Sequence, residues 1–102
     1  MFRRRFSDVV KRQLDLFERD YADLIRECDE AEDTYDRAER EDAEELYGDY
    51  MDLVETGTEA LAELRDNYAR TLDEAAAEEY ADTFNRAVLR RLPRFALEIE
   101  DL

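Results

Sequence analysis

Apolar residues recur along the first third of the chain with the spacing of a helical stripe. They follow one another at alternating steps of four and three residues, and the stripe consists of Val10, Leu14, Phe17, Tyr21, Leu24, Cys28, Ala31, Tyr35 and Ala38. An average step of about 3.5 residues is the seam of a coiled coil, along which one helix packs against another. Ser7 precedes this seam and is a natural N-cap, since its hydroxyl can accept a hydrogen bond from an unpaired backbone N–H. We therefore predict a first helix over residues 7–39.

A second apolar series begins in a different register. It consists of Ala43, Tyr47, Tyr50, Val54, Gly57, Leu61, Leu64 and Tyr68. Asp42 and Glu45 form a variant of the capping box, which predicts a turn near residues 39–42 and a second helix over 42–70. No Gly or Pro marks this turn, so one continuous helix with a register shift is the alternative. Gly57 lies on the stripe itself and predicts a close approach of another element to the backbone.

A clearer start opens the third predicted helix. Thr71 and Glu74 have the spacing of a capping box. The apolar series that follows consists of Tyr80, Phe84, Val88, Leu92, Phe95, Ile99 and Leu102. Pro93 interrupts this series, because proline lacks the N–H that a helix needs and restricts the residue before it. We predict a third helix over residues 72–92, with a kink or tail at 93–102 that is either helical or extended.

Three helical stripes joined by short turns are typical of an all-α protein. We predict a single helical domain, residues 1–102, folded as an antiparallel up-down-up three-helix bundle with long coiled-coil-like helices. The seams are stricter than a small monomeric bundle needs. This strictness favours self-association into a homodimer.

The charge of the chain is strongly negative but unevenly distributed. Its 30 acidic and 15 basic residues leave a formal net charge of −15. Basic residues gather within residues 1–12 and 86–94, and the segment between them is acidic. Such a surface repels nucleic acids over most of its area, which argues against direct nucleic-acid binding. No apolar run approaches the roughly 20 residues of a membrane span, and no apolar stretch follows the basic start, so we expect a cytoplasmic protein.

The two basic clusters have different expected roles. In an up-down-up bundle the cluster at 86–94 faces acidic helix ends of the same chain, and cations near a helix C-terminus are stabilising. The first cluster precedes a helix N-terminus, where positive charge is unfavourable. A candidate site for an anionic partner, or for weak contact with a membrane surface, is therefore formed by Phe2, Arg3, Arg4, Arg5 and Phe6. The alternative is a basic arm folded onto the acidic bundle.

The residue types narrow the chemistry of the chain. Histidine is absent, which removes the commonest general base and the commonest metal ligand. The single Ser and the single Cys therefore lack the base of a nucleophilic triad. No acidic residue occupies a seam, as an internal carboxylate–metal site would require. We predict a protein that is not an enzyme, with no catalytic residues, no metal and no cofactor, and we interpret Cys28 as a small buried apolar residue.

All six tyrosines fall on the seams. A buried phenol needs a hydrogen-bond partner, and tyrosine is enriched at protein interfaces, so both roles are open. The candidate interface residues are Tyr21, Tyr35, Tyr47 and Tyr50. The leading hypothesis is a non-enzymatic interaction or scaffold protein that binds a protein partner or itself. The alternative is an acidic regulator that binds a basic protein surface, as a nucleic-acid mimic would, and a metal-binding or catalytic role is the least supported.

Overall fold

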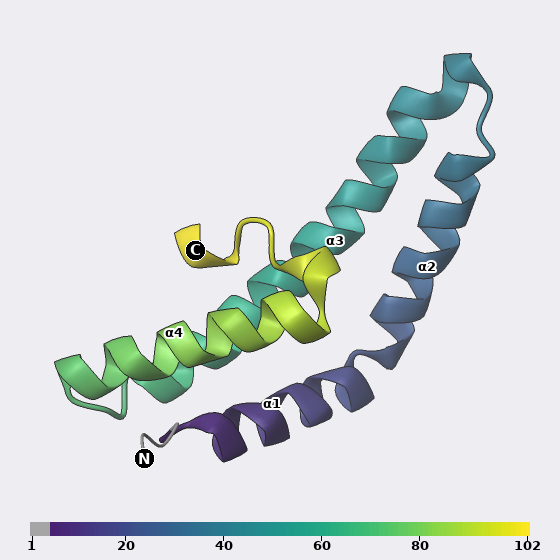
Figure 1. Cartoon of the computed structure of the whole chain (residues 1–102). Coiled ribbons are helices and arrows are strands. Elements are labelled where there is room, and N and C mark those ends of the chain that lie inside the picture. Colours follow the sequence, from purple (N-terminus) through teal and green to yellow (C-terminus); the bar gives the residue numbers. More distant parts are fainter. Residues whose placement is uncertain (1–4) are drawn as a thin grey trace.

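The computed structural model describes residues 5–102, which form four α-helices and two short 3₁₀ turns (Figure 1). The helices are α1 (Ser7–Asp20), α2 (Ala22–Asp36), α3 (Arg40–Ala69) and α4 (Glu74–Arg91). The 3₁₀ turns, Pro93–Phe95 and Ile99–Asp101, lie in the tail that follows α4. The described residues contain no strand, and the predicted all-helical fold is confirmed for them. None of these helices combines the length and the apolar character that a membrane crossing needs.

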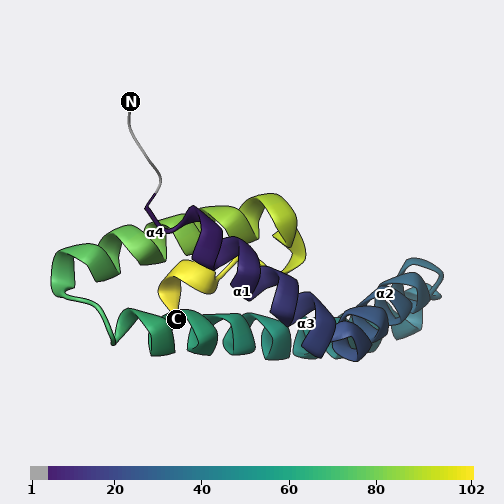
Figure 2. The ribbon, with the colours of Figure 1, turned by 90° about the horizontal axis from the view of Figure 1, so that it is seen from below.

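The helices form a bundle from which a two-helix arm projects. α2 packs against the N-terminal half of α3 in the arm, and α1, α4 and the C-terminal half of α3 lie together in the bundle (Figures 1 and 2). The molecule is therefore elongated, with extents of 53 × 24 × 23 Å. Its radius of gyration is 15.7 Å, against about 13 Å for a compact domain of this length.

The predicted single helix over residues 7–39 is wrong, because the chain bends at Tyr21. This residue has φ −112° and ψ 25°, outside the α region, and its ring stacks on Phe17 with centroids 4.7 Å apart. The N–H of Tyr21 still donates to the Phe17 carbonyl, and the N–H of Ile25 donates to the Tyr21 carbonyl. The bend lets α1 pack on α4 while α2 packs on α3. The structure thus has four helices in place of the predicted three-helix bundle.

The N-caps predicted for the first two helices are also wrong. α1 begins at Ser7 itself, and the preceding Phe6 is buried in the core. α3 begins at Arg40 after an extended Glu39, so Asp42 lies within its first turn. Neither helix has a side-chain cap. Burial of the Phe6 ring decides the start of α1, because it outweighs a capping bond of about 1 kcal/mol. The turn at 37–39 also excludes one continuous helix.

The start of α4 differs from the predicted capping box by two residues. Asp73 is the N-cap, and its carboxylate accepts a hydrogen bond of 2.9 Å from the N–H of Ala76. The Thr71 hydroxyl instead donates to the Tyr68 carbonyl at 2.7 Å. Thr71 therefore closes α3, and the third predicted helix begins at Glu74.

The tail folds back onto α3 and completes the core. α4 ends two residues before Pro93, which confirms the predicted interruption. The tail is neither a regular α-helix nor extended, since both of its ordered parts are 3₁₀ turns. Phe95 and Ile99 are buried, and the Phe95 ring lies against Gly57, where a Cβ would come within 3.0 Å of three ring atoms. The predicted close approach at Gly57 is confirmed.

The core draws on all four helices and the tail. Most of its residues are seam residues that now pack within one chain, so the seams no longer argue for a dimer. Cys28 is buried, as predicted. The core consists of Phe6, Val10, Leu14, Phe17, Cys28, Val54, Leu61, Ala76, Tyr80, Phe84, Val88, Phe95 and Ile99.

Candidate partner-binding surface

Large apolar side chains lie exposed around a groove between α3 and the tail. Leu97 is 82% exposed, Leu102 50% and Tyr47 47%. All three line a cavity of about 280 Å³, which we call the tail groove. The tail groove is lined by Tyr47, Tyr50, Met51, Asp52, Val54, Glu55, Thr58, Glu59, Arg94, Leu97, Glu98 and Leu102. We call its apolar residues the floor, and its acidic residues, Asp52, Glu55, Glu59 and Glu98, the rim.

Buried anchors hold the tail wall of this groove in place. The Thr58 hydroxyl lies 3.2 Å from the Phe95 carbonyl and 3.0 Å from the carbonyl of its own helix at Val54. Arg65, only 4% exposed, donates to the carbonyls of Ile99 at 2.8 Å and Leu102 at 2.7 Å. These bonds fix the backbone on both sides of Leu97. Contacts within the chain therefore fix the shape of the groove.

The rim of the tail groove carries uncompensated negative charge. Asp52, Glu55, Glu59 and Glu98 line it, and no basic side chain of residues 5–102 lies within ion-pair distance of them. The one basic residue of the lining, Arg94, is engaged elsewhere. The lining of the groove therefore contains four carboxylates that have no basic partner among residues 5–102.

Arg94 ties the tail to the arm. Its guanidinium lies 2.8 Å from carboxylate oxygens of both Asp29 and Glu32, and its Nε donates to the Tyr50 hydroxyl at 3.1 Å. Burial opposes the positive charge, but the bonds to Asp29, Tyr50 and Glu32 outweigh it and raise the pKa of Arg94. The predicted contact of the second basic cluster with acidic residues of the same chain is thus confirmed at Arg94. Arg94 thereby joins α2, α3 and the tail.

Three of the four candidate interface tyrosines come together on the arm. The ring centroids of Tyr35 and Tyr47 are 5.2 Å apart, and those of Tyr47 and Tyr50 are 6.5 Å apart. Tyr47 and Tyr50 also line the tail groove. Tyr21 lies apart from them at the bend between α1 and α2. The structure therefore places Tyr47 and Tyr50, two of the four candidate residues, at the groove.

Tyr80, by contrast, is a core residue. Its hydroxyl donates to the Gln13 side-chain oxygen at 2.8 Å, which satisfies the buried phenol. Burial raises the pKa of Tyr80 to about 12.

The candidate N-terminal site is only partly described. Phe2, Arg3 and Arg4 lie outside the described residues. Arg5 is exposed, and its guanidinium carbon lies 5.0 Å from the centroid of the Phe6 ring. That ring packs edge-on against Tyr80, at 5.6 Å between centroids. Phe6 is therefore buried in the core, and Arg5 is the exposed member of the candidate site among the described residues.

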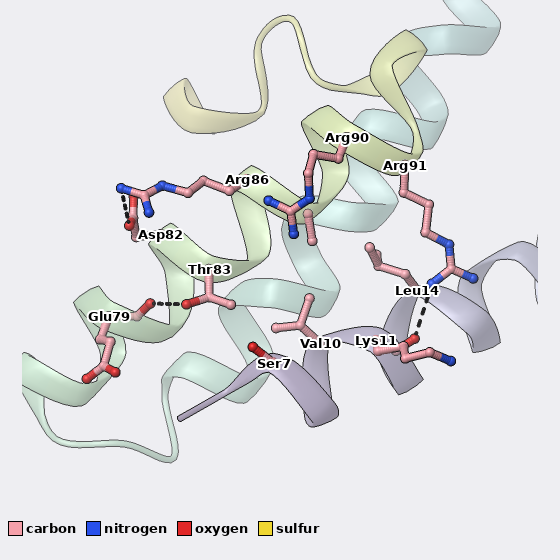
Figure 3. A pocket seen from close by; sticks show the side chains of 11 residues that line it. Ser7, Val10, Lys11, Leu14, Glu79, Asp82, Thr83, Arg86, Arg90 and Arg91 are labelled. Atoms are coloured by element: carbon pink, nitrogen blue, oxygen red, sulfur yellow. Dashed lines mark hydrogen bonds and ion pairs between the residues drawn. The ribbon is translucent and has the colours of Figure 1, made fainter. Parts of the chain in front are cut away.

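A second groove, of about 460 Å³, runs between α1 and α4 (Figure 3). Arg86, Arg90 and Arg91 of the second basic cluster line it, opposite Ser7, Val10, Lys11 and Leu14. Three of the four arginines of this cluster, Arg86, Arg91 and Arg94, pair with carboxylates.

Arg91 binds the Glu18 carboxylate with two hydrogen bonds, of 2.8 and 3.2 Å, and also pairs with Asp15. These bonds to Glu18 and then Asp15 raise the pKa of Arg91. Arg86 pairs with Asp82 on its own helix at 3.0 Å. Arg91 therefore joins α4 to α1, and the groove owes its shape to this clamp.

The described residues offer no grouping of ligands suited to a metal ion. Cys28 of α2 is buried in the core, and burial raises the pKa of its thiol. A thiol held in the protonated form is a poor nucleophile and a poor metal ligand. Cys28 thus contributes packing.

Three features of the groove were missed in the sequence. Leu97 lies off the third seam, and an apolar residue that a stripe does not need is the signal that could have found it. Arg65 carried no such signal, because its burial follows from the path of the tail. Leu102 was predicted to face the core but lies half-exposed at the groove.

Comparison with protein families, curated proteins and solved structures finds no match for this chain.

Proposed function

We propose that the protein is a non-enzymatic interaction protein that binds a protein partner in the tail groove. The observation that carries the proposal is the convergence of Leu97, Leu102 and Tyr47 on one preformed groove. Exposed apolar side chains on a soluble protein are usually scattered, and their gathering marks interaction sites. Arg65 and Arg94 hold the walls in place, so binding costs less ordering entropy.

Site-specific photo-crosslinking tests this proposal in the native cell. A photoreactive residue at position 97 faces the tail groove, and one at Glu78 on the exposed surface of α4 serves as the control. We expect discrete crosslinked protein adducts from position 97 that are missing from position 78. The same adducts from both positions, or none from position 97, would contradict the proposal.

The acidic rim favours a second candidate function, an acidic regulator that binds a basic protein surface. Asp52, Glu55, Glu59 and Glu98 all lack a basic partner among residues 5–102. Raising the salt from about 0.1 M to about 1 M shortens the Debye length from about 10 Å to about 3 Å, so such binding weakens steeply with salt.

Two neutralised variants separate this function from purely apolar docking. Replacement of Glu55, Glu59 and Glu98 by Gln removes three rim charges, and the control replaces Glu44, Glu45 and Glu78, which are exposed elsewhere. A basic partner should be lost with the first variant and retained by the second. If both variants bound the partner equally well, the apolar floor of the groove would account for recognition without the rim charges.

A further inference from the structure

We propose that the tail groove of one copy binds the N-terminal segment Phe2–Arg5 of a second copy, so that two chains form a reciprocal homodimer. This inference rests on the proposed function of the tail groove as a protein-docking surface. It names the occupant, and the chemistry on both sides of the contact supports it.

The groove selects a segment that carries one apolar anchor beside several cations. Its floor is apolar, with Tyr47 and Leu97 exposed at its edges. Its rim presents four carboxylates, and Arg94, the single cation of the lining, is already bound to Asp29 and Glu32. A phenylalanine followed by arginines matches this surface, because the ring fills an apolar pocket and each guanidinium can pair with a carboxylate.

The chain itself contains such a segment. Residues 2–5 read Phe-Arg-Arg-Arg, the densest run of positive charge in a protein of net charge −15. Arg5, the described member of this run, pairs with no acidic side chain of residues 5–102, whereas Arg91 and Arg94 are bound to carboxylates. The run also precedes the N-terminus of α1, where the helix dipole disfavours cations. Arg5 is thus available for an intermolecular contact.

The geometry favours a groove on another copy. Phe6 is anchored on Tyr80, which packs on Tyr68 of α3 at 4.7 Å between centroids. Of the α3 residues that line the groove, Glu59 lies nearest to Tyr68, about 14 Å away along the helix, and Val54 lies about 21 Å away. Four residues, from Phe6 back to Phe2, span at most about 14 Å. The fully extended segment is therefore shorter than the stretch of α3 between Tyr68 and Val54.

A reciprocal exchange closes the assembly. Each copy donates one segment and receives one, which is the isologous arrangement of a two-fold dimer. Once the first contact has joined the two chains, the second forms within the same complex and is effectively intramolecular. This strengthens a contact that one short segment alone would make only weakly.

A peptide titration tests the contact directly. The probe is the synthetic peptide of residues 1–5 with an amidated C-terminus, titrated into protein that lacks residues 1–4 and so keeps Phe6 in the core. We expect saturable binding with NMR shifts centred on Leu97, Leu102 and Tyr47. The Phe2→Ala peptide should bind about tenfold to a hundredfold more weakly, since it loses the apolar anchor. Equal binding to a Leu97→Glu protein, or shifts centred outside the groove, would overturn the proposal.

Charge exchange tests the dimer in the full chain. Sedimentation should show a dimer for the native sequence and monomers for two variants, R3E/R4E/R5E and E55R/E59R/E98R. An equimolar mixture of the two should dimerise again, because each reversed segment then meets a reversed groove. The control R12E/R19E/R26E reverses three exposed arginines elsewhere and should remain a dimer.

Two results would contradict the proposed dimer. One is a native chain that stays monomeric up to about 0.1 mM, and the other is an R3E/R4E/R5E variant that still dimerises. Either result would leave the proposed function standing if photo-crosslinking at position 97 still captures a different protein. Loss of both readouts would end both proposals.

Discussion

Replacement of the two glycines of α3 by alanine should change stability in opposite directions. Alanine is favoured over glycine within a helix by about 1 kcal/mol. Apart from its chain neighbours and the backbone of its own helix, no atom lies within 4 Å of a Cβ added at Gly48, so only this helix propensity acts there. We therefore expect Gly48→Ala to raise the free energy of unfolding by about 1 kcal/mol.

At Gly57 the added methyl group meets the Phe95 ring. Three ring atoms would lie within 3.0 Å of the new Cβ, and the ring has little room to move, because it is buried and packs edge-on against Phe17 at 5.9 Å. Forcing a methyl group into a packed core costs about 1–3 kcal/mol. This cost offsets the propensity gain, so Gly57→Ala should lower the free energy of unfolding by up to about 2 kcal/mol. The two variants should differ by the whole packing cost.

Urea unfolding followed by far-ultraviolet circular dichroism measures both effects, and thermal unfolding provides a check. For a domain of this size, a change of 1 kcal/mol in the free energy of unfolding shifts the midpoint temperature of thermal unfolding by roughly 4–8 °C. In a Phe95→Leu background the side chain is smaller, and Gly57→Ala should lose much of its penalty. If Gly57→Ala stabilised the unchanged chain as much as Gly48→Ala does, the packing of the tail on α3 described above would be refuted.

Three further predictions concern buried or paired polar groups. Arg65→Met should cost about 2–4 kcal/mol in urea unfolding, because the tail carbonyls lose their donor; a loss below about 1 kcal/mol would contradict this role. The bond from Arg91 lowers the pKa of Asp15, so this pair stabilises the fold above the ordinary value of 3.8, and its contribution is lost as the pH falls below 3.8 through the lowered pKa. In the Asp15→Asn variant the free energy of unfolding should therefore fall less steeply than in the native chain as the pH is lowered below 3.8. An unchanged pH dependence would show that the pair does not contribute to stability. Burial raises the pKa of Tyr80 to about 12, so stability that is complete below pH 10.0 is lost as the pH rises toward 12. Ultraviolet titration should show one late tyrosine that Tyr80→Phe removes, and persistence of that step would assign it to another residue.

The periodic spacing of apolar residues was enough to predict which segments are helical and which residues form most of the core. Val10, Leu14 and Phe17 on one stripe, and Tyr80, Phe84 and Val88 on another, are buried as their spacing indicates. Helix periodicity is a local property, and it survives into the fold because burying a stripe is the main way in which a helix gains stability.

Two backbone features were also readable along the chain. Pro93 ends α4 because proline cannot supply the next helical hydrogen bond. Gly57 marks a contact because only glycine leaves room for a ring against the helix. Both conclusions follow from the chemistry of a single residue, so no partner had to be known in advance.

The tertiary structure alone decided the features that depend on neighbours distant in the sequence. The bend at Tyr21 leaves the apolar seam unbroken, and it exists because α1 and α2 pack on different helices. The burial of Arg65 and the exposure of Leu97 both follow from the return path of the tail over α3. The tail groove could not be predicted from spacing, because its walls lie about forty residues apart in sequence and meet only when the tail folds back onto α3.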